Sequence, residues 1–429
     1  MNDTIVACST ARGKGAVAII RLSGSEALPI AEKVFSPMPK EPMRLVRGVF
    51  SAEYFKDDGM CVFFRAPKSM TGEDSVEFYL HGGTALVDGA IRECILRGAR
   101  IAERGEFTKR AFLNGKMTLD ACEGVIEMID AESALAVRSG FGIMTGRLSE
   151  KADEMQTALT ELIARIEVAL DYPEEDLELI TAEEAGKELV SLKRESEKLL
   201  RDSACAPIIR NGADIVIVGR VNAGKSSLMN ALLGRDRAIV SDEEGTTRDV
   251  IEASFNYKDM KFNLFDTAGL RETMNAVEAE GIRRAEEVSG ECDLILFVTD
   301  DLSEKREFSA PHIRVLNKCD QRNYTAEEGD SVISALTGEG VGELKERIYS
   351  FFEEKGICDS LVVTNARQLD CLKRADDAIS QALSAIKEAT MDCAAQPLYT
   401  AWNALGEITG RTVAEEIVDT VFSRFCLGK

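Results

Sequence analysis

Residues 219–226 have the sequence GRVNAGKS and fit the pattern G-x-x-x-x-G-K-[ST]. They directly follow an apolar run that favours a strand and open a run that favours a helix, the setting that a phosphate-binding loop requires. The glycines let the backbone turn until several N–H groups point at phosphate oxygens. We expect Lys225 to reach the β and γ phosphates and the Ser226 hydroxyl to bind Mg²⁺. The segment therefore predicts a nucleoside triphosphate site.

Three more short motifs stand where later apolar runs end: residues 266–269 (DTAG), 317–320 (NKCD) and 334–336 (SAL). The Asp320 carboxylate can accept both the guanine N1–H and the exocyclic amine, which adenine cannot offer. Because α/β sheets bind ligands at the carboxyl ends of their strands, the motifs predict one site that selects guanine. The expected GTP contacts are Asn222, Ala223, Gly224, Lys225, Ser226, Ser227, Ser241, Thr246, Thr247, Asp266, Thr267, Ala268, Gly269, Asn317, Lys318, Asp320, Ser334, Ala335 and Leu336.

Residues 241–249, between the first two motifs, are expected to form a switch loop that senses the γ-phosphate. Within it, Thr247 is the candidate to complete the Mg²⁺ ligands begun by Ser226 and Asp266. Lys225 and Thr247 are therefore expected to act in hydrolysis as well as in binding.

The group that orients the attacking water is less evident. Leu270 stands where a Ras-type enzyme has glutamine and cannot do this work. Glu278 is a candidate catalytic carboxylate, but the residues alone leave open that it is a solvated helix residue. The role of Asn222 is open in the same way. Its side chain either binds a K⁺ ion that neutralises phosphate charge or stabilises a turn.

The elements that must position these motifs lie in residues 212–355. Apolar strand-like runs alternate there with helical segments, a pattern typical of a parallel α/β sheet. The expected strands are 214–218, 261–265, 294–299, 313–316 and 331–334.

The two flanks differ from this block. Residues 1–117 read as an α+β module, with strands expected at 5–9, 16–22, 46–55, 61–65 and 75–80 and a helix at 84–97. Apolar residues recur at helical spacing after Leu119 and again after Thr364, and Thr181 with Glu184 forms a capping box. We expect the helical flanks, 118–211 and 356–429, to pack together with residues 212–355 inserted between them as a Ras-like G domain.

Composition narrows the class of protein. A net charge of −22 opposes a broad electrostatic grip on RNA or anionic lipid, so another subunit or a local basic patch must hold any RNA backbone. Two histidines and eleven scattered cysteines argue against histidine-ligated metal sites, structural zinc and disulfides, and favour the cytoplasm. No signal peptide or membrane span is expected.

The whole chain resembles the MnmE (TrmE) family of tRNA-modification GTPases. The resemblance runs from residues 3–7 (DTIVA) to the terminal FCLGK and includes segments 71–74 (TGED), 81–83 (HGG), 104–108 (RGEFT), 110–114 (RAFLN), 171–173 (DYP), 222–227 (NAGKSS) and 266–272 (DTAGLRE).

The resemblance implies a folate-binding N-terminal domain that dimerises, a helical domain and an inserted G domain. It also implies that K⁺ bridges two G domains and switches on hydrolysis, and that the homodimer joins an FAD-containing partner of the MnmG/GidA type. Such a complex adds an aminomethyl-type (carboxymethylaminomethyl) group to C5 of the wobble uridine in certain tRNAs. The one-carbon unit comes from 5-formyltetrahydrofolate or another tetrahydrofolate derivative.

Residue by residue, the resemblance assigns K⁺ to Asn222 and water orientation to Glu278. The remaining implied K⁺ ligands lie on the switch loop: Ser241, Glu243 and Thr246. The implied folate contacts are Arg21, Glu77, Lys116 and Lys429. Cys426 matches the family's C-terminal cysteine, although a small apolar residue beside Phe422 and Phe425 would fit the sequence equally well.

Two departures from the family pattern bear on the K⁺ site. Val221 replaces the usual proline before Asn222, and Glu243-Glu244 adds acid to the segment that wraps the ion. A different class of function also fits the G domain alone: an RNA- or ribosome-associated assembly GTPase that modifies nothing. Such proteins lack the folate-like N-terminal module and the Cys426–Lys429 tail. A folate-dependent one-carbon transferase with a regulatory GTPase is the third alternative.

Overall fold

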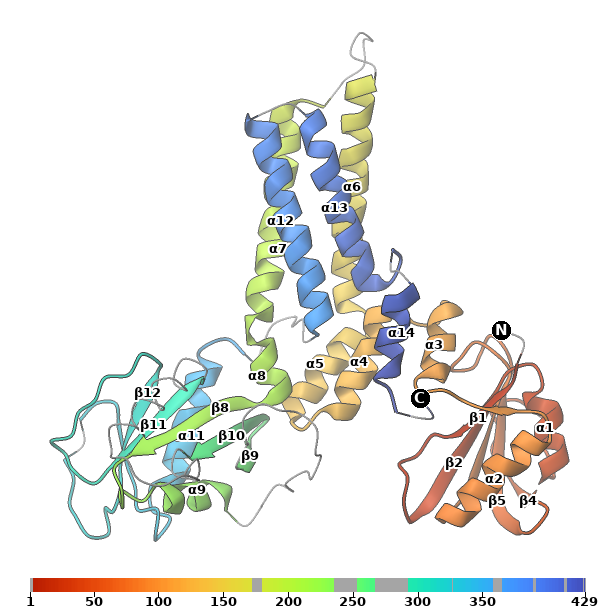
Figure 1. Cartoon of the computed structure of the whole chain (residues 1–429), viewed down its shortest axis with the longest axis horizontal. Coiled ribbons are helices and arrows are strands. Elements are labelled where there is room, and N and C mark those ends of the chain that lie inside the picture. Colours follow the sequence, from red (N-terminus) through yellow and green to blue (C-terminus); the bar gives the residue numbers. More distant parts are fainter. Residues whose placement is uncertain are drawn as a thin grey trace, which may run out of the picture. The chain divides into compact units, whose positions relative to one another are not determined.

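The computed structural model describes residues 3–171, 180–234, 253–266, 292–325, 327–357, 365–388, 391–412, 415–426 and 428. They form two compact units (Figure 1). The first combines residues 1–126, 143–193 and 370–429, and the second combines 127–142 and 194–369. Within the described residues, no helix is long and apolar enough to cross a membrane.

The first unit contains a seven-stranded sheet with the order β3-β4-β5-β6-β2-β1-β7. Neighbouring strands are antiparallel except β1 and β7, which are parallel. The strands are β1 (Ile5–Cys8), β2 (Gly15–Ser23), β3 (Phe35–Ser36), β4 (Val46–Ser51), β5 (Lys56–Phe64), β6 (Ser75–Gly82) and β7 (Arg100–Ile101).

Alternation along these strands separates a core face from a face that holds charged groups. Ile20 and Leu22 pack with Phe78 against α1 (Ala27–Val34) and α2 (Thr84–Leu96). Arg21, between Ile20 and Leu22, therefore points to the opposite face. Part of that face is covered by α3 (Glu106–Leu113), whose Phe107 packs on Ile5 and Ala7.

Helices that precede and follow residues 212–355 pack together in the first unit. The α6 and α13 helices lie side by side (Figure 1), where the Trp402 indole donates to the Thr160 hydroxyl at 2.9 Å. Lys193 and Asp376 form an ion pair at 2.7 Å. The helices that follow α3 outside the central block are α4 (Leu119–Asp130), α5 (Ala134–Met144), α6 (Arg147–Asp171), α7 (Ala182–Asp202), α12 (Ala366–Glu388), α13 (Asp392–Thr409) and α14 (Glu415–Ser423).

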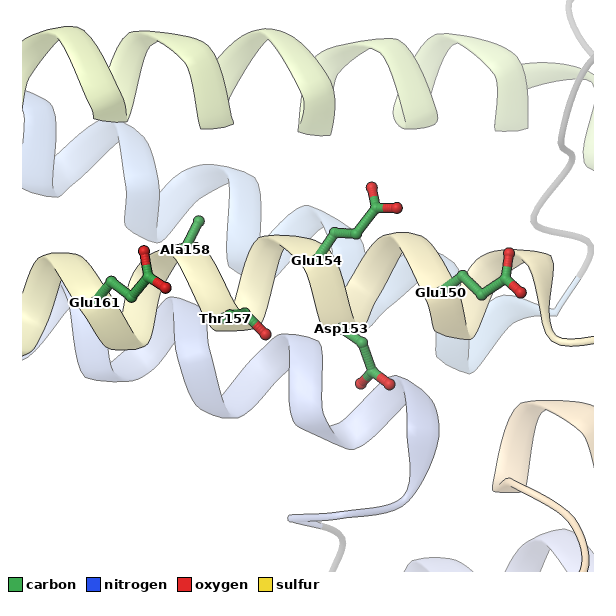
Figure 2. A pocket seen from close by; sticks show the side chains of 6 residues that line it. All are labelled: Glu150, Asp153, Glu154, Thr157, Ala158 and Glu161. Atoms are coloured by element: carbon green, nitrogen blue, oxygen red, sulfur yellow. The ribbon is translucent and has the colours of Figure 1, made fainter.

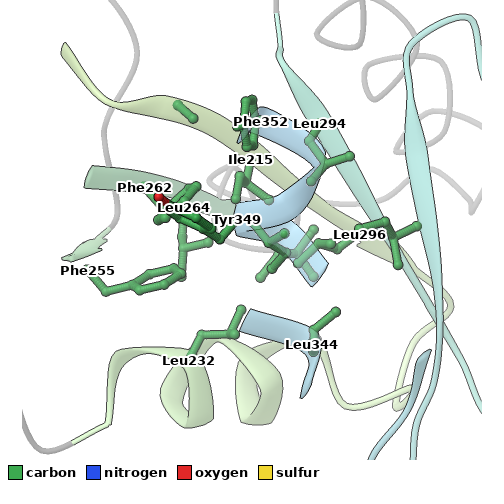
Figure 3. Packing of buried hydrophobic residues seen from close by; sticks show 14 of the residues in the cluster. Ile215, Leu232, Phe255, Phe262, Leu264, Leu294, Leu296, Leu344, Tyr349 and Phe352 are labelled. Atoms are coloured by element: carbon green, nitrogen blue, oxygen red, sulfur yellow. The ribbon is translucent and has the colours of Figure 1, made fainter. Parts of the chain in front are cut away.

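The second unit contains a six-stranded sheet with the order β13-β12-β11-β8-β10-β9. Apolar side chains of its central strands pack against Leu232 of α9 and Leu344 and Phe352 of α11 (Figure 3). The elements are α8 (Ala206–Asn211), β8 (Ala213–Gly219), α9 (Lys225–Leu233), β9 (Ala253–Tyr257), β10 (Met260–Asp266), β11 (Leu294–Thr299), β12 (His312–Leu316), β13 (Asp330–Val332) and α11 (Val341–Glu353), with a short 3₁₀ helix at Ser203–Cys205.

Most expected elements of the sheets are confirmed, and three expectations need correction. The second sheet is mixed, because β9 is an antiparallel edge strand joined to β10 by a tight turn in which Lys258 has φ +52°. The strand expected at 61–65 begins at Lys56, since the buried Asp57 accepts a bond from the His81 amide instead of forming a turn. The strand expected at 46–55 ends at Ser51.

Local signals at two helix boundaries are also confirmed. The Thr181 hydroxyl accepts from the Glu184 amide at 3.2 Å, while the Glu184 carboxylate accepts from the Thr181 amide at 2.9 Å. This is the reciprocal pair of a capping box. The α6 helix ends at Asp171, before Pro173.

Candidate functional site

The phosphate-binding motif forms the turn between β8 and α9. Gly224 precedes the helix with φ +97°, and a Cβ there would lie 2.1 Å from the Asn317 Nδ2. Only glycine fits both the backbone conformation and the space. The Lys225 ammonium donates to the carbonyls of Gly219 and Arg220, each at 3.0 Å. These contacts hold the lysine over its own loop, beside the N–H groups that open α9.

Asn317 joins three parts of this edge of the sheet. Its side chain is 3% exposed. The Nδ2 donates to the Ala223 carbonyl at 2.8 Å, and the Oδ1 accepts from the Ala335 amide at 3.0 Å. The phosphate-binding loop, the NKCD motif and the SAL motif are therefore tied together by one amide side chain.

The carboxylate expected to recognise guanine is also held in place. The Ser334 hydroxyl donates to the Asp320 Oδ1 at 2.6 Å, and this bond lowers the pKa of Asp320. Asp320 is therefore ionised at neutral pH, and an ionised carboxylate accepts N–H groups. Leu336, the last residue of the SAL motif, is 80% exposed.

The first unit holds a second group of predicted residues, on the sheet face opposite the α1–α2 core. Arg21 and Glu77 are register partners on β2 and β6, and the Arg21 Nε donates to the Glu77 Oε1 at 2.8 Å. The Tyr79 hydroxyl donates to the other oxygen of Glu77 at 2.9 Å. The Arg21 guanidinium lies 5.6 Å from the centre of the Phe107 ring. The pair is 16% and 13% exposed, so these residues are not ordinary surface charges.

Comparison with known proteins assigns the chain to a family. A family model described as the GTP-binding protein TrmE N-terminus matches residues 4–116, and one described as the MnmE helical domain matches residues 119–426. The chain is 38% identical to the tRNA modification GTPase MnmE of Clostridioides difficile (strain 630) and 39% identical to that of Bacillus subtilis (strain 168), with all of each chain covered. The chain belongs to the MnmE family.

Solved structures add nothing to this assignment. The G domain of the T. maritima FeoB iron transporter is 25% identical over 32% of this chain and 98% of its own, with a TM-score of 0.25.

Several of the predicted site residues lie outside the described residues. These are Ser241, Glu243, Thr246, Thr247, Thr267, Ala268, Gly269, Glu278 and Lys429, together with the side chain of Asp266. The backbone of Asp266 ends β10, in parallel register with Ile217 of β8. Its position at the carboxyl edge of the sheet agrees with the expected Mg²⁺ role.

The described residues fit GTP and its metal in chemistry. The loop offers converging backbone amides, the Lys225 ammonium and the Ser226 hydroxyl at the first turn of α9. The Asn317 amide leaves no room for a side chain at residue 224, so the turn before α9 keeps a glycine. Asn222 is exposed on the same loop with φ +65°, which leaves its amide oxygen accessible to a cation.

Sequence reasoning missed a group of buried charges centred on Arg110, in the same unit as the Arg21–Glu77 pair. Arg110 is 2% exposed and donates to Asp3, Glu73 and Glu106. Burial alone would raise the pKa of Glu106, but hydrogen bonds from Arg100, the Glu103 amide and Arg110 hold it below its usual value. The motifs TGED and RGEFT contain two of these acids, Glu73 and Glu106. The sequence therefore showed the acids, but it did not show that Arg110 pairs with them.

The remaining predicted residues of this region are more exposed. The Lys116 ammonium donates to the Pro67 carbonyl at 3.0 Å. Cys426 is exposed, while Phe422 and Phe425 are buried, so the reading of Cys426 as a buried apolar residue is wrong. The tail after it returns to the sheet, where the Ser9 hydroxyl donates to the Gly428 carbonyl at 3.0 Å.

A pocket of about 580 Å³ lies elsewhere in the first unit, on α6 (Figure 2). Its lining residues are Glu150, Asp153, Glu154, Thr157, Ala158 and Glu161. Four carboxylates make it a poor place for any anionic ligand. It contains none of the predicted site residues.

Proposed function

We propose that this member of the MnmE family hydrolyses GTP and thereby drives a modification of tRNA. The observation that carries the proposal is the Asn317 side chain, which ties the phosphate-binding loop to the segments expected to hold the guanine base. In this arrangement Lys225 pairs with the β and γ phosphates, and Asp320 accepts from the guanine N–H groups. The base is thus selected at the same edge of the sheet where the triphosphate is cleaved.

The metals and the attacking water require residues of the switch segments. Ser226, Thr247 and Asp266 would hold Mg²⁺, which supplies positive charge to the phosphates when bound. K⁺ would be held by Asn222 with Ser241, Glu243 and Thr246. Glu278 would orient the water, with Lys225 and Thr247 stabilising charge around the γ-phosphate.

The test of this reading is steady-state GTP hydrolysis by the purified protein in K⁺ and then in Na⁺ at equal ionic strength. We expect much faster turnover in K⁺, and loss of that turnover in Glu278→Ala with GTP affinity unchanged. Equal, slow rates in both salts would favour the assembly GTPase instead. Unchanged turnover in Glu278→Ala would remove Glu278 from the mechanism.

For the N-terminal region, residues 1–117, we propose a tetrahydrofolate site formed by Arg21, Glu77, Lys116 and Lys429. Glu77 can accept from pterin N–H groups, and the cations can pair with glutamyl carboxylates. The Tyr79 hydrogen bond fixes the Glu77 carboxylate for that task, and burial together with this bond raises the pKa of Tyr79. The bound folate would supply the one-carbon unit.

The folate site is tested by calorimetric titration with 5-formyltetrahydrofolate. Arg21→Ala should abolish measurable binding, and Tyr79→Phe should weaken it about fivefold to tenfold, the value of one hydrogen bond. Arg44→Ala is the matched control, because Arg44 pairs with Glu41 on the surface with both side chains about 70% exposed. Equal affinity in wild type and Arg21→Ala would contradict the site.

The chemistry on RNA completes the proposal. The chain would act as a homodimer through residues 1–117, joined to an FAD-containing MnmG/GidA-type partner. The complex would add a carboxymethylaminomethyl-type group at C5 of the wobble uridine. The helical parts, 118–211 and 356–429, would connect this chemistry to the G domain at 212–355. Loss of the modified uridine in cells that lack the protein would separate this function from a folate transferase that does not act on tRNA.

A further inference from the structure

The end of the chain packs tightly against the start of α3. Gly105 precedes that helix with φ +67°, and a Cβ there would lie 2.5 Å from the Phe422 carbonyl oxygen and 3.0 Å from the Phe425 Cβ. The Phe112 and Phe422 rings lie 6.1 Å apart. Both the backbone conformation and the close approach require glycine at position 105. The contact therefore places residue 104 beside the segment 422–425, although more than three hundred residues separate them in sequence.

Two cations flank this contact. Arg104 immediately precedes Gly105, Arg424 lies between the two phenylalanines that pack there, and both arginines are exposed. Within the part of the chain that the structure describes, neither guanidinium has a carboxylate partner or a hydrogen bond. Lys109, one turn into α3, is by contrast paired with Asp419 at 2.5 Å. The junction thus offers two unneutralised guanidinium groups in a chain whose net charge is −22.

Exposed arginines of this kind suit phosphate. A guanidinium donates two parallel N–H bonds to phosphate oxygens and is only weakly hydrated, so it binds a phosphodiester well. Contacts to the sugar-phosphate backbone position a protein on RNA without reading its sequence. The α6 pocket cannot serve this purpose, because four carboxylates line it.

We propose that Arg104 and Arg424 bind the sugar-phosphate backbone of the substrate tRNA. The proposal rests on the proposed function in tRNA modification and adds the surface that the RNA meets on this chain. Cys426 lies two residues beyond Arg424 and is also exposed. A backbone held by the two arginines would bring the RNA to the tail that carries this thiol and returns to the sheet at Ser9.

The test is binding of the full-length protein to a fluorescently labelled tRNA transcript with uridine at the wobble position, followed by anisotropy over a series of KCl concentrations. Loss of two phosphate contacts should reduce the slope of log affinity against log salt by roughly 1.5 to 2, and weaken binding about tenfold or more at low salt. We expect this result for Arg104→Ala/Arg424→Ala. The variant with lysine at both positions should keep the slope, because lysine still neutralises phosphate.

The matched control is Lys33→Ala/Lys40→Ala, which removes the same charge from two exposed positions of the same unit. Its slope and affinity should equal those of the wild type. If the control weakens binding as much as the arginine variant, net charge alone explains the effect and the proposed surface is wrong. An unchanged slope in Arg104→Ala/Arg424→Ala, or a wild-type protein that does not bind the transcript at low salt, overturns the proposal equally.

Two further measurements distinguish the tRNA surface from the proposed folate site and from the proposed GTPase function. Titration with 5-formyltetrahydrofolate tests whether the arginines serve a glutamyl carboxylate, and lost folate affinity with an unchanged tRNA slope would assign them there and overturn the tRNA surface. GTP hydrolysis in K⁺ should match the wild type in the arginine variant, because the G domain is untouched. Failure of the wild type itself to hydrolyse GTP would count against the proposed function.

Discussion

The nucleotide edge of the second sheet and the Arg21–Glu77 face of the first sheet solve different binding problems in different ways. At the nucleotide edge, backbone groups and short loop motifs do most of the work, and one side chain, Asn317, holds the motifs together. On the other face, Arg21 of β2 pairs with Glu77 of β6, and a separate buried network is centred on Arg110 of α3. We therefore expect contiguous loops to bind the ligand in the first case and register partners to bind it in the second.

This difference decides what each site depends on. A phosphate-binding loop needs a turn conformation and amide hydrogens, which the fold provides before any ligand arrives. A buried charge network needs every partner, because an isolated charge in the interior is strongly unfavourable. We therefore expect substitutions to affect ligand binding at the nucleotide edge and stability on the N-terminal sheet.

The largest effect is expected from Arg110→Met. This change leaves Glu73 and Glu106 without their buried cation and should lower the free energy of unfolding by about 3–5 kcal/mol. Urea unfolding followed by the fluorescence of Trp402, the single tryptophan and a residue of the same unit, measures it. Arg44→Ala, which breaks an exposed pair, should cost at most about 1 kcal/mol. Equal losses in the two variants would break the contrast between the sites.

Asp320→Asn should have a smaller effect and a different kind of effect. An amide cannot accept both guanine N–H groups, so GTP affinity should fall by about 1.5–3 kcal/mol, and affinity for xanthosine triphosphate should rise. Stability should stay near that of the wild type, because Asp320 lies at the end of a loop and its partner Ser334 can bond to the amide oxygen. Competition binding with the two nucleotides tests the change, and unaltered GTP preference would contradict the role of Asp320.

The smallest effect should come from His81 and should depend on pH. The hydrogen bond between the His81 Nδ1 and Asp57, at 2.6 Å, raises the pKa of His81, and Asp58 adds to this shift. A raised pKa stabilises the folded protein below the unfolded value of about 6.5, and this contribution disappears as pH rises through the folded pKa. The urea midpoint of wild type should therefore exceed that of His81→Gln at pH 5.5 and converge with it at high pH.

Trp402 fluorescence again reports on the correct unit, and His312→Gln, in the other unit, is the control. His312→Gln should not show the pH-dependent loss of urea midpoint that is expected for His81→Gln. A difference between wild type and His81→Gln that does not change between pH 5.5 and pH 9 would show that His81 contributes through packing instead of charge.

The sequence predicted the strands of the nucleotide edge well, because their signals are local. Each motif follows an apolar strand directly, and parallel strands bring their ends together whatever the loops contain. The antiparallel strand β9 was missed because the apolar pattern of an edge strand does not reveal whether it runs parallel or antiparallel to its neighbour. The start of β5 was missed because Asp and Gly are depleted in strands, whereas Asp57 is buried here against His81.

The N-terminal site could be named from residue types only through family resemblance. Arg21 and Glu77 are 56 residues apart, and their pairing depends on the register of β2 with β6. A slip of one strand by one residue would place its member of the pair on the core face, so no local pattern encodes the pair. The same reason explains why the burial of Arg110 was not predicted, although Arg110 opens the segment RAFLN at 110–114.

The Asn317 amide has a consequence for how GTP and its fragments bind. Because one side chain bridges the Ala223 carbonyl and the Ala335 amide, ordering of the guanine-side loop and of the phosphate-side loop should be thermodynamically coupled. Guanosine and pyrophosphate added together should then each bind more tightly than either does alone, a positive cooperativity that Asn317→Ala would abolish. Release of the base would correspondingly speed release of the phosphates, so that the nucleotide departs as one unit.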